Sequence, residues 1–195
     1  MEDEKSLINA YQNGNEYAAD MLIHKHQTML YRFSLRLTKS QVEADDLFQE
    51  TWVRVFRSLN RYDGDRPFQT WLCTICMNLY RDEYTKKKRW LNVVKDFFSN
   101  EDKDIQLARL PSHSATPEDL TMKQESDEQL LETLNALPDK YRVPLILFYF
   151  QSFSYEEMAD VLDIPVGTVR SRLSNGKKKL KETWKEVEDD DRRTV

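Results

Sequence analysis

The spacing of apolar residues predicts three helices in the first half of the chain. Residues 16–37 repeat at helical intervals, at Leu22, His26, Met29, Leu30, Phe33 and Leu37. A cleaner stripe at alternating steps of three and four follows at Ala44, Leu47, Phe48, Thr51, Trp52, Val55, Phe56 and Leu59. Pro67 suits a helical first turn, and the helix after it is expected to extend to about Arg89 with a core stripe at Phe68, Leu72, Ile75 and Leu79.

The second half predicts four helices, of which the last two form a helix-turn-helix. Leu130, Leu131, Leu134 and Leu137 mark the first, and Pro138 opens the second, which ends at Phe150. Pro144 lies inside it and predicts a kink or a late helix start, since proline lacks the amide donor. Ser154 and Glu157 match a capping box. A short helix to Leu162, a turn at 163–165 and a helix from Val166 follow.

Composition supports an all-α protein of two small helical domains. The 195 residues include only four glycines, too scattered for a phosphate-binding loop, and the abundant Leu, Lys, Glu and Gln favour helix. Residues 91–124 lack periodicity and predict a flexible linker. We therefore expect domains at 1–90 and 125–185, an acidic linker at 91–124 and an acidic tail at 186–195.

Several classes of protein are disfavoured. The longest apolar run, residues 143–150, is far shorter than the ~20 residues of a membrane-spanning helix. No secretory signal is visible at the N-terminus, and two cysteines are too few for a disulfide scaffold. These features predict a cytoplasmic protein.

The distribution of charge indicates nucleic-acid binding despite a net charge of −5. Residues 166–181 carry six basic side chains and no acidic one, and a second basic cluster spans residues 86–89. Each cluster alone could be a solvated surface. The first, however, coincides with the second helix of the helix-turn-helix, the element that enters the major groove of DNA. The residues expected to face DNA there are Arg170, Ser171, Arg172, Asn175 and Lys178.

In the first half, aromatic residues alternate with basic ones, as in proteins that stack unpaired bases beside a cationic groove. They are Tyr62, Phe68, Trp71, Tyr80 and Tyr84, near Arg61, Arg66, Arg81 and the cluster at 86–89. The competing interpretation is that these rings only fill a helical core. Asp45, Asp46, Gln49 and Glu50 form either a solvated surface or an acidic docking surface for a basic partner.

Cys73 and Cys76 match the bare spacing of a redox or zinc motif. No βαβ pattern surrounds them, and a zinc site would need distant histidines as further ligands. We expect buried thiols in a helix, with no metal, no cofactor, no catalytic residues and no enzymatic activity.

Three motifs together closely resemble the extracytoplasmic-function sigma factors of the sigma-70 family. They are DDLFQETWVRVF at 45–56, FQTWLCTICMN at 68–78 followed by Asp82, and SYEEMA at 154–159 continuing to IPVGTVRSRL at 164–173. The resemblance covers nearly the whole chain and implies two helical domains, sigma regions 2 and 4.

The resemblance also implies roles for individual residues. It places polymerase docking, on the clamp helices of the largest subunit, at Asp45, Asp46, Gln49 and Glu50. It places opening and recognition of the minus-10 element at Asn60, Arg61, Tyr62, Asp63, Arg66, Trp71, Asn78, Arg81, Lys86, Lys87, Lys88 and Arg89. Recognition of the minus-35 element falls to Thr168, Arg170, Ser171, Arg172, Asn175 and Lys178.

The partners implied are core RNA polymerase, promoter DNA and an anti-sigma factor, often membrane-anchored. Two other hypotheses remain open at this point. One is an autonomous helix-turn-helix transcriptional regulator, which would normally bind palindromes as a dimer. The other is a redox or zinc enzyme built on Cys73 and Cys76.

Overall fold

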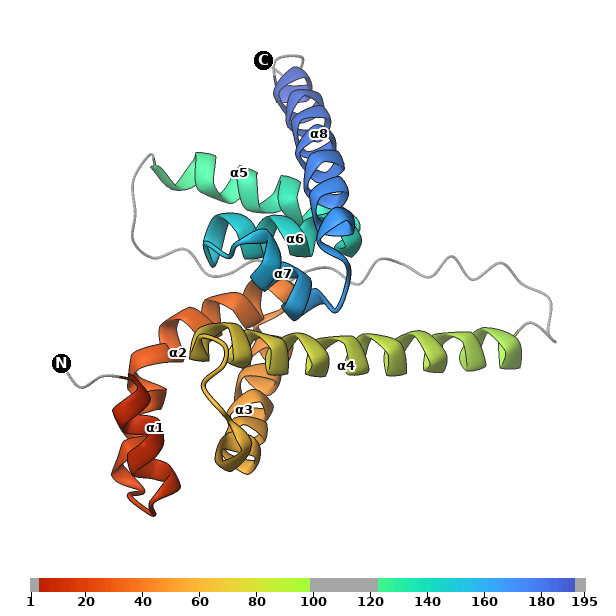
Figure 1. The fold of residues 1–195 in the computed structure, drawn as a ribbon. Coiled ribbons are helices and arrows are strands. Elements are labelled where there is room, and N and C mark those ends of the chain that lie inside the picture. The colour runs from red at the N-terminus through yellow and green to blue at the C-terminus, as the bar shows by residue number, and fades with distance from the viewer. Residues whose placement is uncertain (1–3, 99–122, 192–195) are drawn as a thin grey trace. The chain divides into compact units, whose positions relative to one another are not determined.

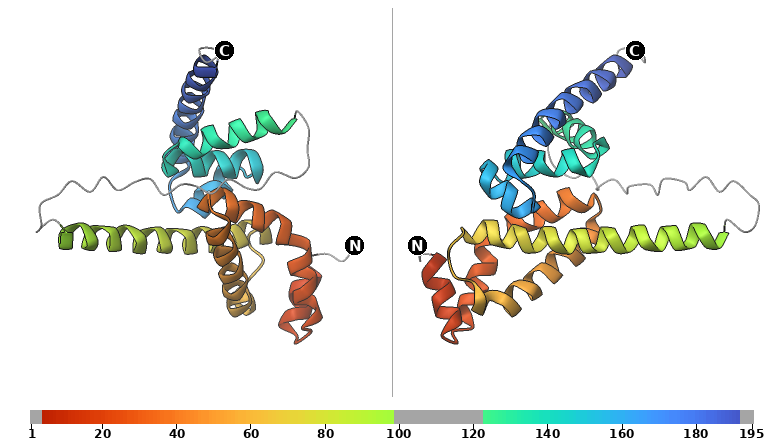
Figure 2. Two further views of the ribbon diagram at one scale, coloured as in Figure 1. Left: turned by 180° about the vertical axis from the view of Figure 1, so that it is seen from behind. Right: turned by 45° about the vertical axis from the view of Figure 1, so that its right-hand side comes forward.

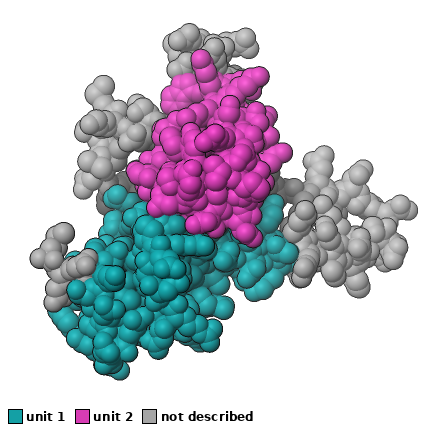
Figure 3. Space-filling view, viewed as in Figure 1, with its two compact units in different colours: residues 1–114 teal, residues 115–195 magenta. Residues whose placement is uncertain are grey.

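Helices make up the regular structure of the chain, as its composition predicts. The computed structural model describes residues 4–98 and 123–191, with side chains at 4–87 and 130–184. Within these ranges it contains eight α-helices, one short 3₁₀ helix and no strand (Figure 1). The chain divides into two compact units, residues 1–114 and 115–195 (Figure 3). The all-α fold with two helical units is therefore confirmed.

The first unit is built around helix α2. Its elements are α1 (Glu4–Gln12), α2 (Tyr17–Thr38), α3 (Gln41–Ser58), η1 (Leu59–Arg61) and α4 (Phe68–Phe98). Helix α2 packs against α1, α3 and α4, and the predicted stripes of α2 and α3 point inward. The fully buried apolar side chains at their contact are Leu22, Leu30, Phe33, Leu37, Ala44, Val55 and Leu59.

Helix α4 differs from its prediction in both its core stripe and its end. The buried side carries Leu72, Cys73, Cys76 and Met77, whereas Ile75 and Leu79 are only half-buried. The reason is that α4 contacts both α2 and α3, so its buried surface is wider than one stripe and is rotated toward the thiols. The helix also continues as one element to Phe98 rather than ending near Arg89 (Figure 2).

The second unit contains α5 (Lys123–Ala136), α6 (Asp139–Phe150), α7 (Tyr155–Leu162) and α8 (Val166–Asp191). Helix α6 begins at Asp139, so the predicted late start after Pro144 is wrong, and Pro144 is buried inside the helix. Helix α8 packs against α5, α6 and α7. Its buried residues are Val169, Leu173 and Gly176.

The helix-turn-helix of α7 and α8 forms as predicted. Ser154 and Glu157 make the full capping box: the Glu157 amide donates to Ser154 Oγ at 3.2 Å, and the Ser154 amide donates to Glu157 Oε2 at 2.8 Å. Asp163 ends α7 in the left-handed region, with φ of 51°, and the Ile164 amide donates to the Ala159 carbonyl at 3.2 Å. Local hydrogen bonds thus define where α7 begins and ends, and buried Met158, Val169 and Leu173 lie in the same pair of helices.

The segments expected as linker and tail are partly helical. Residues 91–98 belong to α4, and residues 186–191 belong to α8. The rest of the expected linker, up to residue 122, and residues 192–195 lie outside the described residues. Among the helices that are described, none combines the length and the apolarity that crossing a membrane requires.

Candidate protein-docking surface and nucleic-acid interface

The four predicted docking residues lie on one side of α3, away from its buried stripe. Asp46, Gln49 and Glu50 are exposed, and Asp45 is half-buried. Asp45 accepts a hydrogen bond from the Tyr31 hydroxyl, which raises the pKa of Tyr31 because the carboxylate stabilises the phenol. Glu50 Oε1 lies 3.8 Å from a guanidinium nitrogen of Arg54, one turn later on the same helix. The side chains of this acidic face stay available to a basic partner.

Glu43 extends the acidic face, although the motif comparison did not include it. It lies one turn before Asp46 and one further turn before Glu50 on the same helix. Its carboxylate forms an ion pair with Lys87 on α4. Spacing of three and then four residues was visible in the sequence and could have added it to the set.

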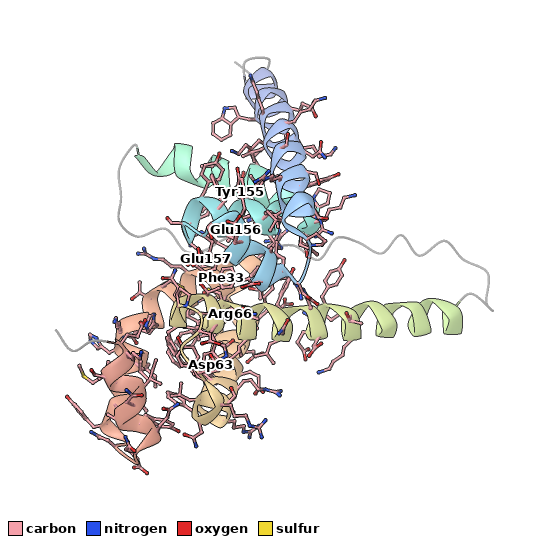
Figure 4. The ribbon with its side chains drawn as sticks, viewed as in Figure 1. Phe33, Asp63, Arg66, Tyr155, Glu156 and Glu157 are labelled. Carbon is pink, nitrogen blue, oxygen red and sulfur yellow. The ribbon has the colours of Figure 1, made fainter. Side chains whose placement is uncertain are left out.

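The loop between η1 and α4 is held by short-range hydrogen bonds. The Asp65 amide donates to Asp63 Oδ1 at 3.0 Å, and the Tyr62 hydroxyl donates to the Arg66 carbonyl. Gly64 has φ of 81°, a conformation that glycine adopts without strain. Figure 4 shows Asp63 and Arg66 on this loop. Asn60, Arg61, Asp63 and Arg66 are all exposed.

Three aromatic rings pack together where the loop joins α4. Tyr62 packs against Phe68 and Trp71, with ring centroids 5.7 Å and 5.0 Å apart, and Phe68 is 5.6 Å from Trp71. Phe68 is fully buried, which confirms its core role, whereas Tyr62 and Trp71 are half-buried and keep part of each ring accessible. Burial raises the pKa of Tyr62, with smaller contributions from Glu4 and Asp63.

The predicted basic residues of α4 whose side chains are described already have partners: Lys86 and Lys87 are exposed and Arg81 is half-buried. Arg81 donates to Asn78 Oδ1 at 3.3 Å, Lys86 lies 2.7 Å from Glu83, and Lys87 pairs with Glu43. The backbone of Lys88 and Arg89 belongs to α4, but their side chains lie outside the described residues. Any phosphate that binds here must therefore compete with acidic neighbours.

The predicted recognition residues of α8 lie on the exposed side of the helix and along its edges. Ser171, Asn175 and Lys178 are exposed and opposite the buried stripe, whereas Thr168 and Arg172 are half-buried. The Ser171 hydroxyl donates to the Thr168 carbonyl at 3.0 Å. Together they present hydroxyl, amide and cationic groups, the chemistry that recognises base edges and phosphates.

Arg170 occupies the flank of α8 that faces an aromatic cluster. Its guanidinium lies 5.7 Å from the centroid of the Tyr155 ring, and Lys177 Nζ lies 4.9 Å from the centroid of Phe148. Cation–π contacts restrain these long side chains without neutralising them. Tyr155 opens α7, where Figure 4 places it beside Glu156 and Glu157.

Cys73 and Cys76 are buried in α4, as expected. Burial raises the pKa of Cys76 to about 11 and raises that of Cys73 well above its ordinary value. Both thiols are therefore protonated near neutral pH, the unreactive form. Within the described ranges, no three His, Cys, Asp or Glu side chains come together as a metal site.

Family models divide the chain in the same way as the motifs. Residues 22–90 match the model for sigma-70 region 2, and residues 127–180 match the model for sigma-70 region 4. Together these matches include the acidic face, the loop at 62–67, the basic end of α4 and the helix-turn-helix.

Curated relatives agree with the family models. The chain is 33% identical over 163 residues to the extracytoplasmic-function RNA polymerase sigma factor SigE of Mycolicibacterium smegmatis, covering 84% of this chain but 60% of the relative's length. It is 31% identical to the RNA polymerase sigma-H factor of Pseudomonas aeruginosa, over 88% of this chain and 89% of the relative. It is 27% identical to the extracytoplasmic-function RNA polymerase sigma factor SigW of Bacillus subtilis, over 94% of this chain and 97% of the relative.

Solved structures share the fold. Sigma factor RpoE of Bartonella quintana, in complex with the anti-sigma factor NepR, matches with a TM-score of 0.65 and 23% identity, over 85% of this chain and 96% of that one. CnrH, in complex with the cytosolic domain of CnrY, matches with a TM-score of 0.64 and 23% identity, over 92% of this chain and 95% of that one. Taken with the family models and the curated relatives, the motifs show that the chain belongs to the extracytoplasmic-function RNA polymerase sigma factors of the sigma-70 family.

Proposed function

We propose that this sigma factor divides its work among three surfaces: α3 docks on core RNA polymerase, the loop at 62–67 with α4 opens and recognises the minus-10 element, and α8 recognises the minus-35 element. Residues 1–90 would act as region 2 and residues 125–185 as region 4. One observation carries this proposal. An acidic face and a basic, aromatic-lined surface occur on adjacent helices of the same unit, held together at Glu43 and Lys87.

The acidic face supports polymerase docking through electrostatic complementarity. Asp46, Gln49 and Glu50 project from a helix whose other side is locked into the core, so their positions are fixed before a partner arrives. Carboxylates presented from a fixed helix favour a basic partner surface and steer its approach. The clamp helices of the largest polymerase subunit are the partner that we expect here, through Asp45, Asp46, Gln49 and Glu50.

The loop and α4 support promoter opening because they combine stacking rings with cations. Tyr62 and Trp71 keep part of their rings accessible, and unpaired bases stack on such rings with about 1 to 3 kcal/mol each. Arg61 and Arg66 are exposed on or next to the loop, Lys86 is exposed farther along α4, and all three can contact the phosphate backbone. The loop and α4 would thus bind the separated strands of the minus-10 element more tightly than the duplex.

Helix α8 supports minus-35 recognition by placing Arg170, Ser171, Arg172, Asn175 and Lys178 around its exposed side. An arginine that bridges a guanine edge contributes roughly 1 to 3 kcal/mol of discrimination. A single recognition helix is too small for high specificity alone. The polymerase-bound factor would reach high specificity by binding the minus-10 and minus-35 elements at the same time.

Sigma factors are non-catalytic regulators of transcription, and we assign no enzymatic reaction to this chain. We place it in the cytoplasm, where the polymerase acts. Two relatives of similar fold were solved with an anti-sigma factor or with a cytosolic partner domain. By that likeness we propose an anti-sigma partner for this chain as well.

The docking role is tested by binding to core polymerase. We expect the double variant Asp46→Ala/Glu50→Ala to lose about tenfold in affinity, which corresponds to about 1.4 kcal/mol, measured by fluorescence anisotropy of the labelled protein at moderate salt. The control is Glu16→Ala/Asp20→Ala, which removes two exposed carboxylates at the same spacing, one from the N-cap of α2 and one from its first turn. Equal affinity of both variants, with circular dichroism unchanged, would refute docking through α3.

A further inference from the structure

The loop between η1 and α4 is attached to helix α1, which precedes the segment that matches the region 2 model. That match begins at residue 22, whereas α1 spans Glu4–Gln12. Leu7 and Ile8 are buried, so α1 belongs to the core of the first unit. The same helix is linked to the loop directly through Gln12 and indirectly through Glu4.

The first attachment is Gln12. Its side-chain amide donates to the Leu59 carbonyl at 3.0 Å and to the Tyr62 carbonyl at 3.3 Å. The Leu59 carbonyl belongs to the first residue of η1, and the Tyr62 carbonyl belongs to the first residue of the loop. One side chain therefore fixes both the last residue of the α3 core stripe and the first aromatic residue of the loop.

The second attachment lies under the opposite end of the loop. Glu4 Oε1 accepts a hydrogen bond at 2.6 Å from Nε2 of His26, a buried residue of α2. The His26 ring packs against Phe68, with centroids 5.1 Å apart, and Phe68 in turn supports Tyr62 and Trp71. An open cleft of about 490 Å³ lies between α1 and the loop, so these two attachments, rather than continuous packing, connect them.

From this geometry we propose that α1 sets the conformation of the minus-10 loop, with Gln12 and His26 as positioning residues that touch no DNA themselves. The inference rests on the proposed function of the loop. Gln12 fixes the backbone where the loop begins, and His26 fixes the aromatic floor on which Tyr62 and Trp71 rest. Loss of either attachment leaves α3 and α8 unchanged but lets the loop sample conformations that do not match the DNA.

The test is base discrimination by reconstituted holoenzyme. The full-length chain, bound to core polymerase from the organism that encodes it, selects promoters from duplex DNA randomised at both elements. We expect Gln12→Ala to lose about fivefold in discrimination at the minus-10 element, the factor that one net hydrogen bond contributes. Discrimination at the minus-35 element and affinity for core polymerase are expected to stay at the wild-type level.

The matched control is Asn13→Ala. Asn13 is the next residue, and its amide donates only to the Asn9 carbonyl, at 2.9 Å, without reaching the loop. Gln12→Glu keeps the size of the side chain but has no amide donor, so it should behave like Gln12→Ala. A loss of stability of the first unit would lower affinity for core polymerase together with minus-10 discrimination, so unchanged core affinity separates positioning from unfolding.

The outcomes separate the inference from the function on which it rests. Arg66→Ala on the loop itself should weaken selection of the minus-10 element. If it does and Gln12→Ala does not, the positioning role of α1 is wrong and the proposed function stands. If neither variant changes minus-10 selection, the loop does not recognise that element and both proposals fail. His26→Gln provides a second, independent variant of the same attachment system and should match Gln12→Ala.

Discussion

Gly176 lies where α8 packs closely on α6, and its replacement by alanine tests the packing of the second unit. A Cβ atom added there would lie 3.2 Å from Leu145 Cδ1 and 3.2 Å from the Tyr141 carbonyl oxygen. Leu145 is buried and the Tyr141 oxygen belongs to the backbone of α6, so neither can move away freely. The two helices must therefore separate slightly or Leu145 must repack.

Two opposing terms determine the size of the effect. Alanine favours a helix interior over glycine by about 1 kcal/mol, and overpacking costs about 1 to 3 kcal/mol. We expect Gly176→Ala to destabilise the second unit by up to about 2 kcal/mol. Gly167→Ala is the control, because a Cβ at Gly167 meets no atom within 4 Å. It should be neutral or stabilising, so the difference between the variants approximates the packing term.

Hydrogen exchange of the full-length protein measures this difference in the second unit alone. Peptides from α6 and α8 report the opening free energy of the second unit separately from that of the first. The measurement therefore does not assume that both units unfold in one transition. Faster exchange in Gly176→Ala than in Gly167→Ala is the expected result. Equal protection in the two variants would show that α6 and α8 have room for a methyl group and would refute the argument.

Two further predictions concern single residues. Ser152 has φ of 56° without being glycine. Ser152→Gly removes backbone strain of about 1 to 2 kcal/mol but increases the conformational entropy of the unfolded chain, so the free energy of unfolding of the second unit should rise by about 0.5 to 1 kcal/mol. An unchanged midpoint of urea unfolding would contradict this prediction. His26 has a lowered pKa because burial outweighs the favourable Glu4 carboxylate, with Lys25 also lowering it. Between the lowered pKa of the folded chain and the ordinary value of 6.5, the unfolded chain binds a proton that the folded chain does not. Stability therefore decreases as the pH is lowered through this range, by at most about 1.4 kcal/mol per pH unit. His26→Gln should flatten this slope in urea titrations of the first unit between pH 7 and pH 5; an unchanged slope would exclude His26 as its source.

Helical periodicity predicted the elements whose burial is one-sided. The stripe of α3 was predictable because its buried residues repeat at steps of three and four from Ala44 to Val55, and the stripe continues to Leu59 in η1. The capping box at Ser154 was equally predictable, since it depends on residues three apart in sequence. Helix α4 was harder because it contacts both α2 and α3, and its buried centre falls on Cys73 and Cys76, which the stripe omitted.

The end of α4 and the role of α1 could not be inferred for different reasons. Residues 90–98 contain no glycine or proline to stop a helix, yet their irregular hydrophobic spacing concealed its continuation to Phe98. The contacts of Gln12 with Leu59 and Tyr62 join residues about 50 positions apart. Such contacts depend on tertiary packing, so no local pattern in residues 4–12 could indicate them.

The ion pairs on α4 bear on why recognition of the minus-10 element should depend on polymerase. Lys86 and Lys87 are exposed, but they already interact with Glu83 and Glu43. DNA affinity grows with the number of phosphates that a protein neutralises, and each phosphate here must displace a carboxylate in a chain whose net charge is −5. Glu43 also extends the acidic face of α3. A basic partner on that face would draw Glu43 away from Lys87, so on the proposed function docking on polymerase itself frees a cation for the promoter.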